Sequence, residues 1–187
     1  MEIKHLRAPL SDADLAGLKA GDSVLISGVI YTARDAAHKK MTELIEQGKP
    51  LPLDLKGQVL YYVGPTPAKP GGVIGSAGPT TSGRMDLYTP RMLEQGMKAC
   101  IGKGMRSAAV KEALKKHKAV YLAAVGGAGA LLSKRVLKSE IVAYPELGAE
   151  AIRRLEVKDF PATVINDLHG NDLYEEGIKA YSGENKD

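Results

Sequence analysis

One short segment concentrates residue types that could bind an anion. Residues 78–86 read Gly-Pro-Thr-Thr-Ser-Gly-Arg-Met-Asp, so three adjacent hydroxyls, on Thr80, Thr81 and Ser82, precede Arg84. Hydroxyls and backbone amides in a tight turn can bind a small anion, and a neighbouring guanidinium can donate two hydrogen bonds to a carboxylate or phosphate. The same composition also builds ordinary polar surface turns. The segment therefore indicates either an anion-binding turn or an exposed loop, and the rest of the chain must decide between them.

A second candidate lies at the start of a predicted helix. The β-rich stretch 23–31 is followed by Thr32, which can cap a helix running from about 33 to 47. Arg34 and His38 are four residues apart, so we expect them on one helical face, with Asp35 in the favourable first turn. A helix N-terminus that presents both side chains is a candidate anion site. The alternative is an exposed polar surface made of the same residues.

Glycines draw attention to two further places. Lys103 stands between Gly102 and Gly104, which predicts a cation on bare backbone that a ligand can approach, or else a glycine-rich surface turn. Residues 126–132 form a glycine-rich turn after a predicted strand, but their spacing matches neither a dinucleotide fingerprint nor a Walker A loop. Close packing of a helix on a strand, or on a partner, is the better interpretation of that second turn.

Composition narrows the classes of function. The 187 residues suffice for one domain with a sizeable core, and the 44% apolar and 26% charged content is typical of a globular protein. The net charge of +4 comes from interspersed charges, and there is no Trp and only one Phe, so nucleic-acid binding is not expected. Cys100 is the only cysteine, which predicts no disulfide and cannot ligate an iron–sulfur cluster or a structural zinc alone. No signal-like or membrane-spanning apolar run is present, so we expect a cytoplasmic protein.

Strand and helix patterns alternate along the chain, which predicts a single α/β domain over residues 1–187 with a tail that frays from about residue 175. The polar groups fall at strand-to-helix junctions, where ligands commonly bind in α/β folds. Strands are predicted at 23–31, 59–64, 73–77, 119–125, 141–144 and 160–167, and helices after Ser11 and at 33–47, 89–96, 107–117, about 130–137 and 149–155.

Four segments together resemble a known family. They are residues 31–39 with Arg-Asp-x-x-His, residues 78–86 with Thr-Thr-x-Gly-Arg-Met-Asp, Ile-Gly-Lys-Gly at 101–104, and Asp-Leu-His-Gly-Asn at 167–171. In this order they resemble the β subunit of class I (iron–sulfur) fumarate hydratases and of the related L-tartrate dehydratases, over about residues 10–175. The resemblance implies a swivelling β/β/α domain, with a compact β core and helices packed outside. It also implies half of an enzyme, a heterodimer or heterotetramer in which an α subunit binds a 4Fe–4S cluster through three cysteines.

The resemblance also implies roles for individual residues in the reversible hydration of fumarate to malate. A clamp of cations would bind one substrate carboxylate and raise the acidity of the neighbouring carbon, and a base would remove the proton. His38 could carry a proton or could orient Arg34 and the substrate. The implied catalytic residues are His38 and Thr80, the implied substrate-binding residues are Arg34, Arg84 and Lys103, and the implied supporting residues are Asp35, Thr81, Asp86 and His169.

The substrate is a finer question. The Gly-Arg-Met-Asp form at 83–86 is more similar to fumarases than to tartrate enzymes, so we expect fumarate as the substrate, with L-tartrate as the alternative. A second alternative is a non-catalytic domain that binds small dicarboxylates on its own.

Overall fold

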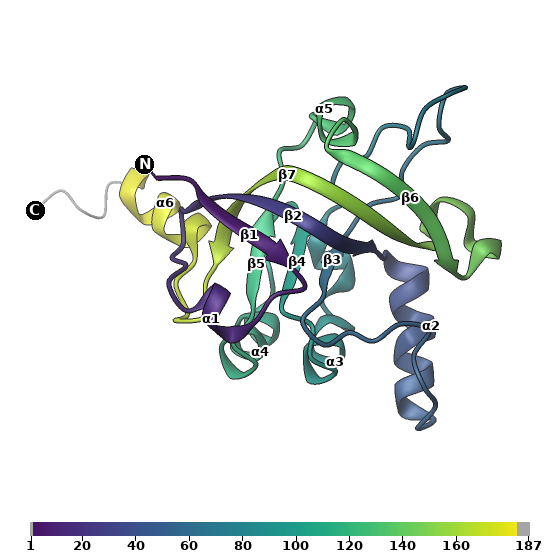
Figure 1. Cartoon of the computed structure of the whole chain (residues 1–187). Coiled ribbons are helices and arrows are strands. Elements are labelled where there is room, and N and C mark those ends of the chain that lie inside the picture. The colour runs from purple at the N-terminus through teal and green to yellow at the C-terminus, as the bar shows by residue number, and fades with distance from the viewer. Residues whose placement is uncertain (1, 183–187) are drawn as a thin grey trace, which may run out of the picture.

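A computed structural model describes residues 2–182. The tail that was predicted to fray from about residue 175 is instead helical up to Tyr181, and its last residues lie outside the described part. Four strands, β2 (Ser23–Thr32), β3 (Val59–Tyr61), β4 (Ala99–Gly102) and β5 (Val120–Ala123), run parallel as successive neighbours. The long strand β7 (Ile152–Asn166) is antiparallel to both β5 and β2, and so closes the five strands into a barrel. Figure 1 shows β7 as a long curved strand that runs beside β2.

Two further strands and six helices complete the fold over residues 2–182. Strand β1 (Lys4–Ala8) adds to β2, and β6 (Val136–Ala143) adds to β7 at the far edge of the sheet. The helices lie outside the barrel (Figure 1), which confirms the predicted α/β class with a compact β core. They are α1 (Asp12–Leu15), α2 (Asp35–Glu46), α3 (Thr89–Glu94), α4 (Ala108–Lys116), α5 (Gly129–Ser133) and α6 (Leu173–Tyr181), with 3₁₀ turns at Ser82–Met85 and Pro145–Glu150.

Alternating side chains along the short central strands divide the apolar residues into two cores. Tyr61, Ile101 and Leu122 belong to a cluster that all five barrel strands share, so they fill the barrel interior. Their neighbours Leu60, Cys100 and Tyr121 point the other way and pack with residues of α2, α3 and α4. Within residues 2–182, no helix is long and apolar enough to cross a membrane.

Several predicted elements are wrong. Residues 149–155 were expected to be helical because Ala, Glu, Arg and Leu favour helices. Instead β7 begins at Ile152, because its first residues pair with the neighbouring strand β6 and, from Arg154 on, also with the distant strand β2. Residues 73–77 form no strand but an extended loop held by Thr66, whose carbonyl oxygen accepts from the Gly75 amide at 3.1 Å. Helix α5 ends at Ser133, before the predicted boundary, and β6 starts earlier than expected.

The predicted cap of the helix at 33–47 is also wrong. Thr32 is the last residue of β2, and its hydroxyl donates to the Ala151 carbonyl at 3.2 Å and accepts from the Arg153 amide at 3.0 Å. Arg34 occupies the cap position of α2 without a side-chain cap. Thr89 is the first residue of α3, and its hydroxyl donates to the Met85 carbonyl at 2.9 Å.

Candidate functional site

The carboxyl ends of β2, β3, β4 and β5 meet at one end of the barrel because these strands are parallel neighbours. The loops that follow them, which we call the site rim, carry Arg34, Gly64, Lys103 and Gly126. In α/β sheets this end is the usual location of ligand sites. The topology therefore brings together residues that are far apart in the sequence.

The segment around Thr80 joins the site rim through backbone pairing. The Thr80 amide donates to the Tyr62 carbonyl at 2.7 Å, and the Thr80 carbonyl accepts from the Lys103 amide at 3.2 Å. The Ser82 amide then donates to the Lys103 carbonyl at 2.8 Å, so Thr81 and Lys103 form a parallel bridge. Predicted site residues from two motifs are thus held side by side, with Thr81 in a structural role through its backbone.

Two arginines at the rim are held by carboxylates. Arg84 projects from the 3₁₀ turn, is 51% exposed, and makes an ion pair with Asp35 at the start of α2. Arg34 Nη2 lies 3.3 Å from Glu150 Oε1, and the other oxygen of Glu150 accepts the Ala36 amide at 3.1 Å. Asp35 therefore fixes an arginine, as predicted, whereas Glu150 was not anticipated from the sequence.

Glycines at the rim make room for side chains rather than for a ligand. A Cβ on Gly64 would lie 2.8 Å from Arg34 Nη1, so the arginine side chain crosses bare backbone there. A Cβ on Gly102 would lie 1.9 Å from Ser82 Oγ. The interpretation of Gly102 as a place for ligand approach is therefore corrected: its missing side chain admits Ser82. Lys103 itself is exposed, and its stem runs 3.7 Å from where a Gly126 Cβ would stand.

Several polar atoms at the rim have no partner among residues 2–182. Arg34 Nε and Asp35 Oδ1 are buried without a hydrogen bond, and the partly buried Thr80 makes none through its hydroxyl within the same described residues. Buried polar atoms are nearly always satisfied in folded proteins, so unsatisfied ones mark places where another group is expected. Here they belong to the carboxylate that pairs with Arg84 and to the guanidinium that pairs with Glu150.

His38 lies behind this surface and not on it. The shared face with Arg34 is a wrong prediction, because Arg34 has an extended cap backbone while His38 belongs to the helix and is fully buried. Its ring packs edge-on to Tyr62 at 5.2 Å. Nδ1 lies 2.8 Å from the Arg34 carbonyl oxygen, which can only accept, so Nδ1 carries the proton and the unpartnered, buried Nε2 carries the lone pair. Burial lowers the pKa of His38 to about 4, so the ring is neutral at pH 7.

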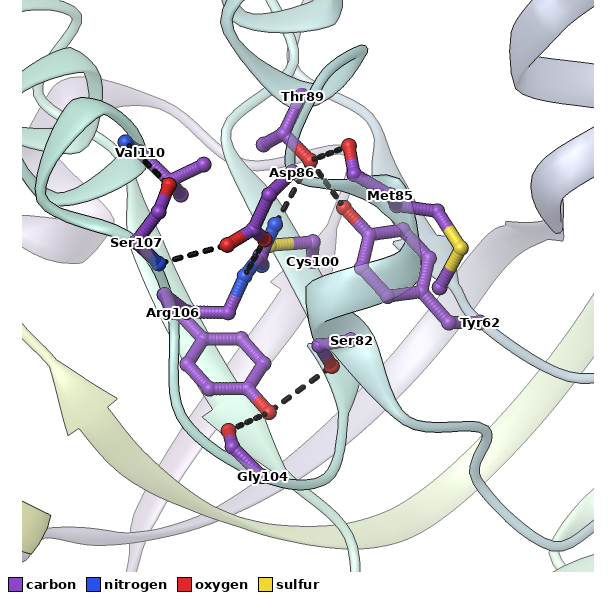
Figure 2. A network of polar contacts seen from close by, with 11 residues as sticks. Tyr62, Ser82, Met85, Asp86, Thr89, Cys100, Gly104, Arg106, Ser107 and Val110 are labelled. Carbon is purple, nitrogen blue, oxygen red and sulfur yellow. Dashed lines mark hydrogen bonds and ion pairs between the residues drawn. The ribbon is translucent and has the colours of Figure 1, made fainter.

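A buried arginine that the sequence did not reveal supports the 80–86 segment (Figure 2). The side chain of Arg106 is 0% exposed, and its Nε donates to Asp86 Oδ1 at 2.7 Å. The other oxygen of Asp86 accepts the Ser107 amide at 2.6 Å, at the start of α4. Asp86 thus fixes an arginine, but Arg106 and not Arg84.

The remaining donors of Arg106 reach two other segments. Nη2 donates to Thr89 Oγ1 at 2.7 Å and Nη1 lies 3.1 Å from Cys100 Sγ. The guanidinium carbon stands 4.8 Å from the centre of the Tyr121 ring, a cation–π contact. Arg106 therefore ties the Arg84 turn, α3 and β4 together. No local sequence signal could have shown this, because its partners come from three separate segments.

His169 is the one predicted site residue that the structure keeps away from the others. Asn166, three residues before it, pairs with Tyr121 near the start of β5, whereas the site rim follows the end of β5. His169 is exposed at the opposite end of the barrel, where its amide donates to Asp167 Oδ1 at 2.9 Å. The motif at 167–171 forms a turn at that end of the barrel.

A metal site is not evident in the part of the chain that the structure describes. Among residues 2–182, no three His, Cys, Asp or Glu side chains gather to hold an ion. Cys100 is buried and engaged by Arg106, so it does not fit as a cluster ligand.

Comparison with known proteins places this geometry in a family. A family model described as the fumarase C-terminus matches residues 2–177. A class I anaerobic fumarate hydratase of Escherichia coli is 41% identical over 175 residues, covering 91% of this chain and 32% of that protein. Fumarate hydratase 2 of Leishmania major is 42% identical over 162 residues, covering 86% of this chain and 28% of that protein.

The chain thus spans about a third of the length of these fumarate hydratases. A provisionally named L(+)-tartrate dehydratase subunit beta of Methanocaldococcus jannaschii is 40% identical over 173 residues, which cover 89% of each chain. The family-model match covers all strands of the barrel and the residues of the site rim. The chain belongs to the fumarase C-terminus family.

Proposed function

We propose that this chain supplies half of the active site of a hydro-lyase that reversibly hydrates fumarate to (S)-malate. The observation that supports the proposal is the site rim itself, where the Thr80 backbone pairs with Tyr62 and Lys103 and carboxylates hold Arg34 and Arg84. Fumarate and malate carry two carboxylates, and guanidinium forks are suited to bind one of them. The fumarate hydratases and the tartrate dehydratase subunit among the relatives support a substrate of this class.

The rim residues divide the chemistry between them. The cations bind one carboxylate and stabilise the negative charge that develops when the neighbouring carbon loses its proton. Thr80 is the proton acceptor in this scheme, and the cations beside it favour the ionised hydroxyl. Asp35 holds Arg84 in place through their ion pair.

His38 has two candidate roles, proton carrier or support for Arg34. The hydrogen bond from Nδ1 to the Arg34 carbonyl favours the second, because it fixes the backbone from which that arginine projects. The buried lone pair of Nε2 favours the role of proton carrier. We therefore assign His38 a positioning role, with proton transfer as the alternative.

The other half of the site belongs to a partner in this proposal. A 4Fe–4S cluster would supply the Lewis acid that polarises the substrate hydroxyl and second carboxylate. This chain's described residues do not fit as its ligands, so we propose that an α subunit, or the remainder of a longer chain, binds the cluster. The relative from M. jannaschii is named a beta subunit, which supports a separate partner.

The test is an anaerobic assay of this chain combined with a cluster-loaded α subunit of a class I fumarase. We expect interconversion of fumarate and malate, measured by the absorbance of fumarate, and none from either component alone. L-tartrate assayed in parallel distinguishes the alternative substrate. A loaded complex that acts on neither substrate contradicts the proposal, and tight malate binding by this chain alone would favour a binding domain instead.

A further inference from the structure

Strand β6 presents a free edge. It is the last strand of the sheet, and within residues 2–182 it pairs only with β7. Figure 1 shows it on the outside of the barrel between α5 and the Pro145–Glu150 turn. Leu137 is 49% exposed and Ile141 is 41% exposed. An open edge with exposed apolar residues is a template for pairing with another strand.

The sequence of this edge is self-complementary. Residues 136–142 read Val-Leu-Lys-Ser-Glu-Ile-Val, which is symmetric about Ser139 in apolar character and antisymmetric in charge. If two copies of β6 pair antiparallel about a two-fold axis at Ser139, Lys138 of one copy faces Glu140 of the other. Leu137 then faces Ile141. Opposite charges and apolar residues in directly opposed positions stabilise antiparallel pairs.

Charges within the chain extend this pattern. In the register with β7, Lys138 lies opposite Glu156, with Nζ 3.5 Å from Oε2, and Glu140 lies opposite Arg154. The paired sheet would therefore contain a row of four opposed side chains, one from each strand. These are Arg154 and Glu140 of the first copy, followed by Lys138 and Glu156 of the second copy. The signs alternate along the whole row, so no charge gains a like neighbour.

The centre of the edge has an unsatisfied hydroxyl. Ser139 Oγ is buried and has no hydrogen-bond partner among the described residues. At a two-fold axis the two Ser139 hydroxyls would stand opposite each other, where one can donate to the other. Serine and threonine pairs of this kind are a recognised contribution to sheet pairing.

We propose that β6 pairs antiparallel with β6 of a second copy of this chain, centred on Ser139, to form a two-fold dimer with a continuous sheet. The register with β7 is regular from Lys138 to Ile141 and bulged on either side, so the new ladder is short. The dimer is therefore expected to be concentration-dependent. This inference does not rest on the proposed function, because it concerns an edge outside the site rim.

The first test is sedimentation of the full chain over a concentration series. We expect a monomer–dimer equilibrium that Lys138→Glu weakens about tenfold or more, since both symmetric charge pairs become repulsive. The double variant Lys138→Glu/Glu140→Lys exchanges the charges and should restore dimerisation. Lys69→Glu, the same charge change in an exposed loop, is the matched control and should leave it unchanged. A chain that stays monomeric, or a dimer that Lys138→Glu leaves intact, overturns the proposal.

The second test fixes the register. Cys100 is buried, so an introduced cysteine has no accessible competitor in the described chain. Ser139→Cys should give a disulfide-linked dimer on mild oxidation, because opposed residues of antiparallel strands lie about 4.5–5.5 Å apart. Glu140→Cys is more exposed but sits off the axis, beyond about 7 Å from its own copy, and should cross-link far less. Equal or reversed yields contradict pairing centred on Ser139 and point to another register or a random encounter.

Discussion

The two ends of the barrel differ in how their charged side chains are paired. At the distal end, formed by residues 167–172, Asp167 accepts the Ala20 amide at 3.1 Å and both the amide and the side chain of Asn171 at 3.0 and 2.7 Å. Asp172 Oδ2 has no hydrogen bond there but faces Lys111 Nζ at 2.5 Å, and the neutral Asn166 Oδ1 is also unpartnered among residues 2–182. At the site rim, the unpartnered atoms of the described chain belong to two charged groups, Arg34 Nε and Asp35 Oδ1. We therefore expect the rim, rather than the distal end, to bind a charged ligand.

The largest effect on stability should follow from breaking the buried pair behind the rim. Arg106→Met leaves the Asp86 carboxylate, 15% exposed, without its cation, and should lower the free energy of unfolding by about 3–5 kcal/mol. Arg106→Lys keeps the charge but loses the several hydrogen bonds of the planar guanidinium, so we expect a smaller decrease in the free energy of unfolding. Urea unfolding measures both.

A second measurement asks whether Arg106 positions the rim or only stabilises the fold. In Arg106→Lys, hydrogen exchange at the Ser82 amide, which donates to Lys103, should speed up more than exchange at the Asn171 amide of the distal end. Equal acceleration at both ends would mean that Arg106 has no particular role at the rim.

The buried histidine should make stability depend on pH. The pKa of His38 falls from its ordinary 6.5 to about 4 in the folded chain, so the unfolded state binds a proton first as pH falls. Its contribution is complete above about pH 6.5 and is lost on acidification towards pH 4, by about 3 kcal/mol in all.

An aromatic side chain that does not titrate, in place of His38, isolates this pH-dependent contribution to stability. His38→Phe should lose less stability between pH 7 and pH 5 than the natural chain does, and the exposed His5→Gln should behave like the natural chain. Identical pH profiles for the natural chain and His38→Phe would show that His38 is not held neutral by burial.

At the distal end, Asp167→Asn should cost stability but not chemistry. Burial by itself raises the pKa of Asp167, but bonds from Asn171 and from backbone amides outweigh it and hold the pKa below its ordinary value. The ionised form therefore stabilises the fold above the unfolded pKa, and this stability is lost as pH falls through the folded value. We expect a loss of about 1–3 kcal/mol at pH 7 in urea unfolding. The kcat of the assembled complex should not change, and a large loss would extend the site to this end.

Glycine-to-alanine substitution should have opposite effects on stability at the site rim and in helix α6. Gly102→Ala places a Cβ 1.9 Å from Ser82 Oγ and should destabilise the chain by about 1–3 kcal/mol. Gly177→Ala in α6 meets nothing within 4 Å and should stabilise it by about 0.5–1 kcal/mol. Thermal unfolding of both variants checks the pair, and a tolerated Gly102→Ala would mean that Ser82 can move aside freely.

The candidate residues were easier to predict from the sequence than the framework. Arg34, Thr80, Arg84 and Lys103 were singled out because their types and glycine-rich surroundings are local features, and the parallel strands place their segments at the same end of the barrel. Their roles in catalysis and binding stay predictions. The first half of β7 was missed because its pairing with β2 and β6 overrides the helix preference of residues 149–155. The burial of His38 could not be foreseen either, since it depends on Tyr62 from a different segment.

The most direct test of the central claim compares two arginines in the complex with a cluster-loaded α subunit. Arg84 pairs with Asp35 at the site rim, whereas Arg91 is an exposed residue of α3 that pairs with Glu94 at 3.0 Å. Arg84→Ala should lower kcat/KM for malate about 100-fold or more, equivalent to about 3 kcal/mol of transition-state stabilisation. Arg91→Ala should retain full activity. An active complex in which Arg84→Ala performs as well as Arg91→Ala would contradict the assignment of the site rim as half of the active site.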